Sequence, residues 1–70
     1  MKEVNLMNKY TLEQWRKLKG FSQEELARKT GLSARTIINY EKKHTLPKAS
    51  YQNVQKIANA LDIKLSQFIL

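Results

Sequence analysis

The chain has 70 residues and no cysteine, and its 13 Lys and Arg residues against 6 Asp and Glu residues give a net charge of +7 at pH 7. This length suits one small domain, and without cysteine neither disulfides nor thiolate metal sites can stabilise it. The apolar runs, of which residues 68–70 are typical, are too short for a signal peptide or a membrane span, so we expect a cytoplasmic protein. A basic balance by itself is weak evidence for DNA as a partner, because membrane-surface and RNA-binding proteins share it.

A first helix is predicted between Thr11 and Gly20. Thr11 can cap it, and Gln14 three residues later completes a capping box. Residues 1–9 have mixed character, and we expect them to be loosely ordered, with one domain over residues 10–70. The expected apolar stripe of this helix consists of Leu12, Trp15 and Leu18.

Two further short helices, joined by a tight glycine turn, are predicted between Ser22 and Glu41. Ser22 can cap the first, with Glu25 completing a capping box, and Ser33 can cap the second. Gly31 lies between them, and a glycine adopts the left-handed conformation that lets the chain turn within about four residues. Helices joined so closely cross at a steep angle, and such a unit can place its second helix in the major groove of DNA.

The second helix of this unit has a polar outer face. On a wheel of 100° per residue, Ile37 and Tyr40 point inward, and an outward row contains Arg35, Asn39 and Lys42. Arginine can bond guanine, and asparagine adenine, through two hydrogen bonds each, and the neighbouring Ile38 can touch a thymine methyl group. The alternative is an ordinary solvated helix face. Six basic residues against one acidic residue between positions 28 and 48 favour the DNA-binding interpretation.

Two more helices complete the expected fold. After Pro47, Ser50 can cap a fourth helix whose apolar positions recur at helical spacing: Tyr51, Val54, Ile57, Ala58 and Leu61. A short fifth helix, about Leu65 to Leu70, is expected to close the core through Leu65, Phe68 and Ile69. No alternating strand pattern occurs, so the expected fold is a compact all-α domain of five short helices.

With these elements in order, residues 11–70 resemble the phage-repressor and Cro type of helix-turn-helix domain, also called the XRE family. The matching residues are 15–20 (WRKLKG), 21–27 (FSQEELA), 31–33 (GLS), 36–37 (TI), 40–41 (YE), Pro47 and 57–63 (IANALDI). The resemblance implies a lambda-repressor-like fold, sequence-specific binding to double-stranded DNA and regulation of transcription, usually as a repressor.

The resemblance also implies roles for individual residues. It places Gln23, the first residue of the second helix, at a position that bonds a DNA phosphate and orients the reading helix. It pairs Arg16 with Glu41 in an architectural ion pair. The expected base-contacting residues are Ser33, Ala34, Arg35, Ile38 and Asn39, with Ala34 exposed near the helix start. The other expected phosphate-contacting residues are Lys42, Lys43, His44 and Lys48.

The chain also departs from the family pattern. Ala34 stands where many members have glutamine, so the target sequence cannot be transferred from them. Lys43 replaces a frequent loop glycine, and Asp62 and Lys64 replace the usual Gly and Ser before the last helix, which weakens its expected cap.

Other kinds of chemistry have little support in the sequence. One histidine, His44, and no cysteine provide neither a set of metal ligands nor a nucleophile–base pair, so we expect no enzyme, metal or cofactor. The rival hypothesis is an antitoxin-like protein-interaction module in which DNA binding is secondary. It rests on the apolar residues 68–70 and the outward Ile38. The same C-terminal helix is also the expected contact of a homodimer.

Overall fold

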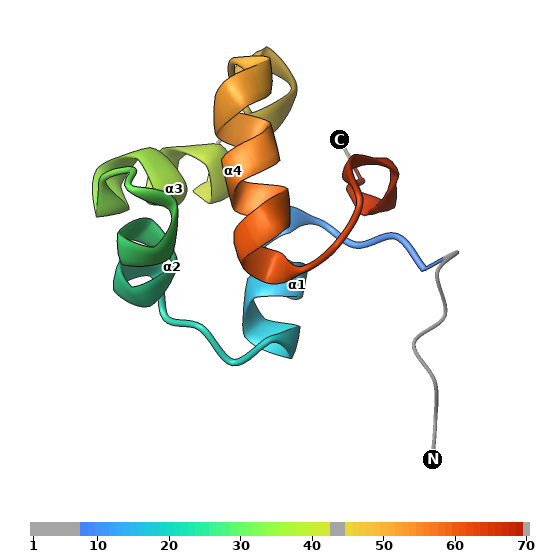
Figure 1. The fold of residues 1–70 in the computed structure, drawn as a ribbon, viewed down its shortest axis with the longest axis horizontal. Helices are drawn as coiled ribbons and strands as arrows, with labels where there is room; N and C mark the ends of the chain where they lie inside the picture. Colours follow the sequence, from blue (N-terminus) through green and yellow to red (C-terminus); the bar gives the residue numbers. More distant parts are fainter. Residues whose placement is uncertain (1–7, 43–44, 70) are drawn as a thin grey trace.

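The computed structural model describes residues 8–42 and 45–69. In this part of the chain it contains four α-helices and two short 3-10 turns. The elements are α1 (Leu12–Leu18), α2 (Gln23–Thr30), α3 (Ala34–Lys42), η1 (Leu46–Lys48), α4 (Tyr51–Leu61) and η2 (Leu65–Gln67). Figure 1 shows α2 and α3 on one side of α4, and the first and last described segments on the other. The all-α prediction is confirmed over these residues, but a fifth α-helix is absent from them.

The helices begin where the capping residues predict. The Thr11 hydroxyl accepts a hydrogen bond from the Gln14 backbone N–H at 3.2 Å, and the Gln14 side chain accepts one from the Thr11 N–H at 2.9 Å. Ser22 and Glu25 form the same reciprocal pair at the start of α2, at 3.0 and 2.8 Å. These bonds satisfy N–H groups that have no acceptor within the helix, so they define both starts locally.

The core lies where all four α-helices meet. Leu26, Ile37 and Ile57 are fully buried, and the other buried hydrophobic residues are Leu12, Trp15, Ala27, Leu46, Ala58, Leu61 and Phe68. Burial of these side chains is the main favourable contribution to folding in a domain of this size.

Two residues expected in the core are exposed instead. Leu18 is 61% exposed, because the inward position at the end of α1 belongs to Arg16, whose side chain reaches α3. Tyr51 is 70% exposed at the first position of α4, whereas Val54, in the same turn, packs against the core. The Tyr51 hydroxyl group donates a hydrogen bond to Gln55 on the helix surface, at 3.2 Å.

The prediction of a C-terminal α-helix is wrong for the described residues. A single 3-10 turn is followed by extended chain at Phe68, which forms an isolated parallel β-bridge with Tyr10. The Tyr10 N–H donates to the Gln67 carbonyl at 3.0 Å, and the Ile69 N–H donates to the Tyr10 carbonyl at 2.9 Å. Backbone groups that a helix would have paired internally are therefore paired with a segment far away in the sequence. Phe68 is buried as expected, whereas Ile69 is 49% exposed.

Candidate nucleic-acid interface

The turn between α2 and α3 is tightly held by local hydrogen bonds. Gly31 has φ +76°, in the left-handed region, and its N–H donates to the Ala27 carbonyl at 2.9 Å. The buried Thr30 hydroxyl donates to the Leu26 carbonyl at 2.9 Å and accepts from the Leu32 N–H at 3.2 Å. These contacts close the end of α2 and start the chain toward α3, which is the αL helix ending that a glycine permits.

The start of α3 is capped in turn by Ser33. The Ser33 hydroxyl accepts a hydrogen bond from the Thr36 N–H at 3.1 Å and lies 2.9 Å from the Thr36 hydroxyl. Ser33 itself is exposed, so this cap leaves one side of the residue open to solvent. The direction of α3 relative to α2 is thus defined by short-range contacts at both sides of the turn.

Two successive isoleucines show which way α3 faces. Ile37 is fully buried, whereas Ile38 is 37% exposed. Arg35 and Lys42 are exposed, and Asn39 is half-buried with no side-chain hydrogen bond to another described residue. The outward row expected from the helical wheel therefore lies on the solvent side of α3. Ala34 differs from expectation, because it is half-buried and packs against the core.

A buried carboxylate ties the far end of α3 to the rest of the domain. The side chain of Glu41 is 4% exposed and accepts hydrogen bonds from Arg16 Nε at 2.6 Å and Arg16 Nη2 at 3.2 Å. Arg16 Nη1 donates to the Phe21 carbonyl at 2.9 Å. The ion pair that the family resemblance implied is thus present, and it joins α1 to α3 and to the loop before α2. A buried pair of this kind need not add net stability, but it restricts geometry.

A third donor to this carboxylate was not foreseen. The side-chain Nε2 of Gln23 donates to Glu41 Oε1 at 3.0 Å. Gln23 and Glu41 are 18 residues apart in the sequence, and no local sequence motif predicts a contact between them. The phosphate contact expected of Gln23 remains a prediction, but its amide group already has an internal partner.

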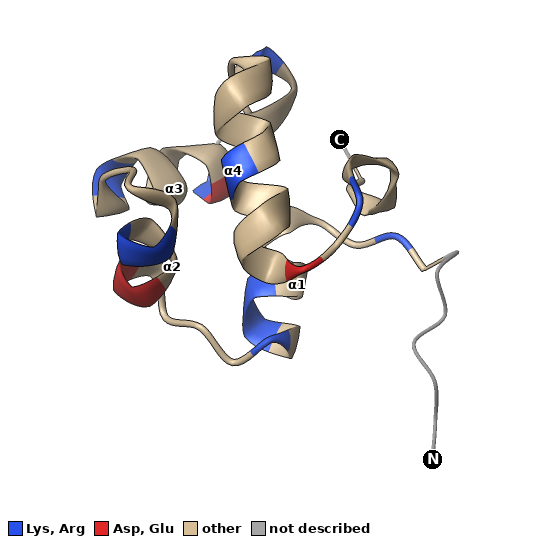
Figure 2. Cartoon of the chain, viewed as in Figure 1, with Lys and Arg blue, Asp and Glu red and all other residues tan. Residues whose placement is uncertain are grey.

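Positive charge accompanies the outward face of α3. Figure 2 shows basic residues on α3 and in the loop between α3 and α4. Arg35, Lys42 and Lys48 are exposed, and the acidic residue of α3, Glu41, is neutralised by Arg16. Such an excess of positive charge attracts the phosphate groups of DNA. Lys43 and His44, also expected to contact phosphate, lie outside the described residues.

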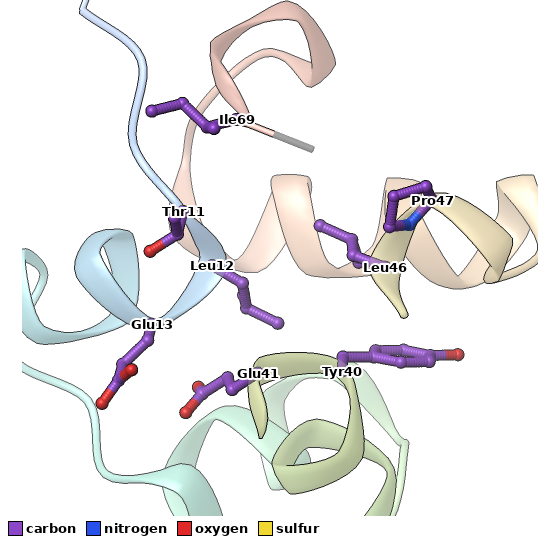
Figure 3. Close-up of a pocket in the computed structure, with 8 residues that line it drawn as sticks. All are labelled: Thr11, Leu12, Glu13, Tyr40, Glu41, Leu46, Pro47 and Ile69. Atoms are coloured by element: carbon purple, nitrogen blue, oxygen red, sulfur yellow. The ribbon is translucent and has the colours of Figure 1, made fainter. Parts of the chain in front are cut away.

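One cavity of the domain is small and partly enclosed. A cavity of about 40 Å³ lies between the start of α1, the end of α3 and η1, where Leu12, Tyr40 and Leu46 line it (Figure 3). Pockets for small molecules usually measure roughly 300–1,000 Å³, so this cavity is far below the size of a metabolite site. Among the described residues no group of three or more His, Cys, Asp or Glu side chains could hold a metal ion. None of the helices described here is long and apolar enough to cross a membrane.

Comparison with known proteins agrees with the geometry. A family model described as helix-turn-helix matches residues 12–68. The chain therefore belongs to this helix-turn-helix family, of the XRE type. It is a family of DNA-binding regulators rather than of enzymes. No curated protein and no solved structure matches the chain.

Proposed function

We propose that this protein is a sequence-specific regulator, acting as a repressor, that places α3 in the major groove of double-stranded DNA. The observation that supports this most is the division of α3 into a buried side at Ile37 and a solvent side with Arg35 and Asn39. Guanidinium and carboxamide groups are suited to guanine and adenine edges, respectively. Ser33, Ala34 and Ile38 complete the proposed base-contacting set, with Ile38 against a thymine methyl group.

Phosphate binding is assigned to basic residues around this helix. Lys42 and Lys48 are exposed next to α3, and Lys43 and His44 follow Lys42 in the sequence. Gln23 belongs to the proposed set as well, because its amide nitrogen donates one N–H to Glu41 and carries a second. Neutralising several phosphates releases counterions, so affinity should fall by orders of magnitude between roughly 50 and 200 mM salt.

The test begins with selection of bound duplexes from a random pool, followed by fluorescence anisotropy on the selected site. Arg35→Ala should cost about 1–3 kcal/mol on that site and relax discrimination at one position. Lys43→Ala should weaken binding to all sequences alike and lower the salt slope by about one. Equal losses on every sequence for both variants would contradict the assignment of roles, and absent or salt-insensitive binding by the unaltered chain would contradict the function itself.

Dimerisation is a separate part of the proposal. Without a C-terminal helix, the apolar surface available near the end of the described chain is the extended segment with the half-exposed Ile69. Two copies related by a two-fold axis would read half-sites about one DNA turn apart. Sedimentation of the free protein at high concentration tests this, and a monomer there would remove the claim.

The rival function is a protein-interaction module with secondary DNA binding. It is favoured by two exposed apolar side chains, Ile38 and Ile69. If it holds, a purified complex should contain a second protein in stoichiometric amount, and Ile38→Ser should weaken that complex more than it weakens DNA binding.

A further inference from the structure

An open, mostly apolar groove runs beside α1. It measures about 420 Å³ and is lined by Tyr10, Gln14, Lys17 and Leu18 (the α1 groove). Leu18, the last residue of α1, is 61% exposed in it. A single exposed leucine is ordinary on a protein surface, but here a half-buried tyrosine and a concave wall accompany it. The groove therefore offers apolar area that a partner can bury.

The α1 groove faces away from the helix proposed to read DNA. Arg16 points from α1 toward α3, where its guanidinium group donates to Glu41. Gln14 and Leu18 are each two positions from Arg16, so they lie about 200° around the helix, almost opposite to it. The segment that leads into α1 also lies on the side of α4 away from α2 and α3 (Figure 1). A molecule in the α1 groove would thus leave α3 open to DNA.

Positive charge lies beside this apolar surface. Lys17 contacts Glu13 at 3.0 Å, but both side chains are at least half exposed, so the pair is weak and exchanges partners readily. Lys19 follows Leu18 and is exposed, with its Nζ 5.8 Å from the centroid of the Trp15 ring. No carboxylate of the described residues pairs with it. A carboxylate bound at the groove would therefore meet one unpaired ammonium group and one that is easily released.

The occupant that these features favour is an acidic segment of a protein. A second copy of the chain also has a net charge of +7, so two such groups of lysines would repel each other. A membrane surface meets the rim of a groove rather than its concave wall, and α1, with seven residues, has little apolar face to bury among lipids. A protein side chain fills a groove, and carboxylates next to it are complementary to the lysines.

We propose that the α1 groove is a docking surface for a segment of another protein that carries a large apolar side chain flanked by Asp or Glu residues. The apolar side chain packs against Leu18 and Tyr10, and the acidic residues lie against Lys17 and Lys19. This surface is separate from the proposed DNA-binding face, so the partner and DNA can be bound at the same time. The chain would then link its DNA site to the protein that carries the acidic segment.

Peptides displayed on phage supply a defined probe. A random library is selected on the unaltered chain, and an enriched peptide is synthesised and titrated by fluorescence anisotropy. We expect enriched peptides to combine a leucine or an aromatic residue with Asp or Glu. Leu18→Ser should weaken binding of such a peptide about tenfold or more, because the apolar contact is lost. The matched control is Ile38→Ser, at the exposed isoleucine of α3, which should leave the affinity for the peptide unchanged.

The contribution of charge is measured separately. Lys19→Gln should weaken binding of the same peptide about two- to fivefold at low salt, as expected for an exposed ion pair, and added salt should reduce the difference. Lys56→Gln, on the exposed surface of α4, changes the net charge equally and should have little effect. Circular dichroism should show that these variants are as helical as the unaltered chain, because every altered side chain is exposed.

The same variants separate this surface from the DNA-binding face. Leu18→Ser should leave binding to the selected duplex unchanged, and Arg35→Ala should leave binding of the peptide unchanged. Loss of duplex binding by the unaltered chain, with peptide binding intact, would overturn the proposed function and leave this docking surface standing. Peptides that depend on Arg35 or Ile38 rather than on Leu18 would occupy α3 in place of DNA, and they would overturn the docking surface.

Two further results would assign the α1 groove to another occupant. A dimer of the unaltered chain that Leu18→Ser dissociates, measured by sedimentation, would overturn the proposal in favour of a second copy. Failure to enrich any peptide that depends on Leu18 would also overturn it. Binding to vesicles of anionic phospholipid that Leu18→Ser abolishes would then identify the groove as part of a membrane-binding surface.

Discussion

The α2–α3 unit and the C-terminal closure of the domain are built on different principles. In the α2–α3 unit, the signals that start both helices and end α2 lie within four residues of where they act: Ser22 with Glu25, Gly31 with Ala27, and Ser33 with Thr36. In the closure, Tyr10 bonds Gln67 and Ile69, nearly 60 residues away. The first kind of contact is encoded in short stretches of sequence, whereas the second depends on how the whole chain has already folded.

The difference extends to how completely polar groups are satisfied. The Gln67 carbonyl accepts both the Tyr10 N–H and the Trp15 indole N–H, the latter at 2.8 Å. The Gln67 side-chain Nε2, however, is buried without a hydrogen-bond partner among the described residues. A buried unsatisfied donor costs free energy. The closure is therefore stabilised by its apolar residue Phe68 and its backbone pairing more than by its side-chain polar contacts.

Among the tests of this contrast, Leu26→Ala in α2 has the largest expected effect. Leu26 is fully buried, and Leu-to-Ala changes at such sites cost about 2–5 kcal/mol because they leave a cavity. Small domains have a free energy of unfolding of only about 5–15 kcal/mol. The substitution should therefore remove a large part of the stability of this domain. Urea denaturation followed by far-UV circular dichroism measures the change. Ile69→Ala, at the half-exposed residue of the closure, is the control and should cost well under half as much stability. Equal costs would mean that Ile69 contributes as much to the packing of the core as Leu26 does.

The next effect concerns the turn itself. Gly31→Ala should destabilise the domain by about 1–2 kcal/mol, because alanine in the left-handed region brings its Cβ too close to the backbone. Beyond the glycine and its two chain neighbours, an added Cβ meets no atom within 4 Å, so the cost comes from local backbone strain alone. Gly20, at φ +83° and with equally open surroundings, is a matched comparison and should show a similar cost on thermal unfolding. A stabilised Gly31→Ala variant would contradict the left-handed turn.

These contrasts explain which parts of the structure could be predicted. The starts of α1 and α2 and the left-handed Gly31 follow from short-range chemistry, and the structure agrees with all of them. Helical periodicity also correctly separated Ile37 from Ile38. It failed for Leu18 and Tyr51, because periodicity gives the face of a helix but not where the core ends along its axis.

The functional residues show the same limit. The outward positions of Arg35 and Lys42 were predictable from the helical wheel, and the Arg16–Glu41 pair from family resemblance. The hydrogen bond between Gln23 and Glu41 was not, because it joins two helices through side chains 18 residues apart. The expected fifth helix failed for a related reason: pairing with Tyr10 captures backbone groups near Phe68, and no local pattern near residue 68 indicates that partner.

A smaller effect is expected at the start of α2. Ser22→Ala removes the hydroxyl that accepts the Glu25 N–H at 3.0 Å and should cost about 1 kcal/mol. Chemical denaturation measures it, with Ser66→Ala, at the exposed Ser66 of η2 in the closure, as the control. The control should change stability by less than half as much, since Ser66 makes no cap hydrogen bond among the described residues. A control that costs as much as Ser22→Ala would show that the two regions do not differ in this respect.

The smallest expected effect is a difference in acid response between two carboxylates. The Ser22 backbone N–H and hydroxyl lower the pKa of Glu25 below its ordinary value of 4.5, and Lys17, at 3.0 Å, lowers the pKa of Glu13. A carboxylate whose pKa is lowered by folding contributes stability that is present above the unfolded value and lost as pH falls through the folded value. Both contributions should therefore disappear on acidification below about pH 4.5, with Glu25 and Glu13 titrating late.

Salt separates the two carboxylates. Both are exposed, but the Glu13–Lys17 attraction is screened by ions, whereas a hydrogen bond to a backbone N–H is not. NMR titration at low salt and at roughly 0.5 M salt should thus move the pKa of Glu13 back toward its ordinary value while that of Glu25 stays lowered. In Ser22→Ala the pKa of Glu25 should rise even at low salt. If salt moved both pKa values equally, the pKa of Glu25 would be lowered by general electrostatics rather than by the capping box. That result would contradict the view that local contacts determine where α2 starts.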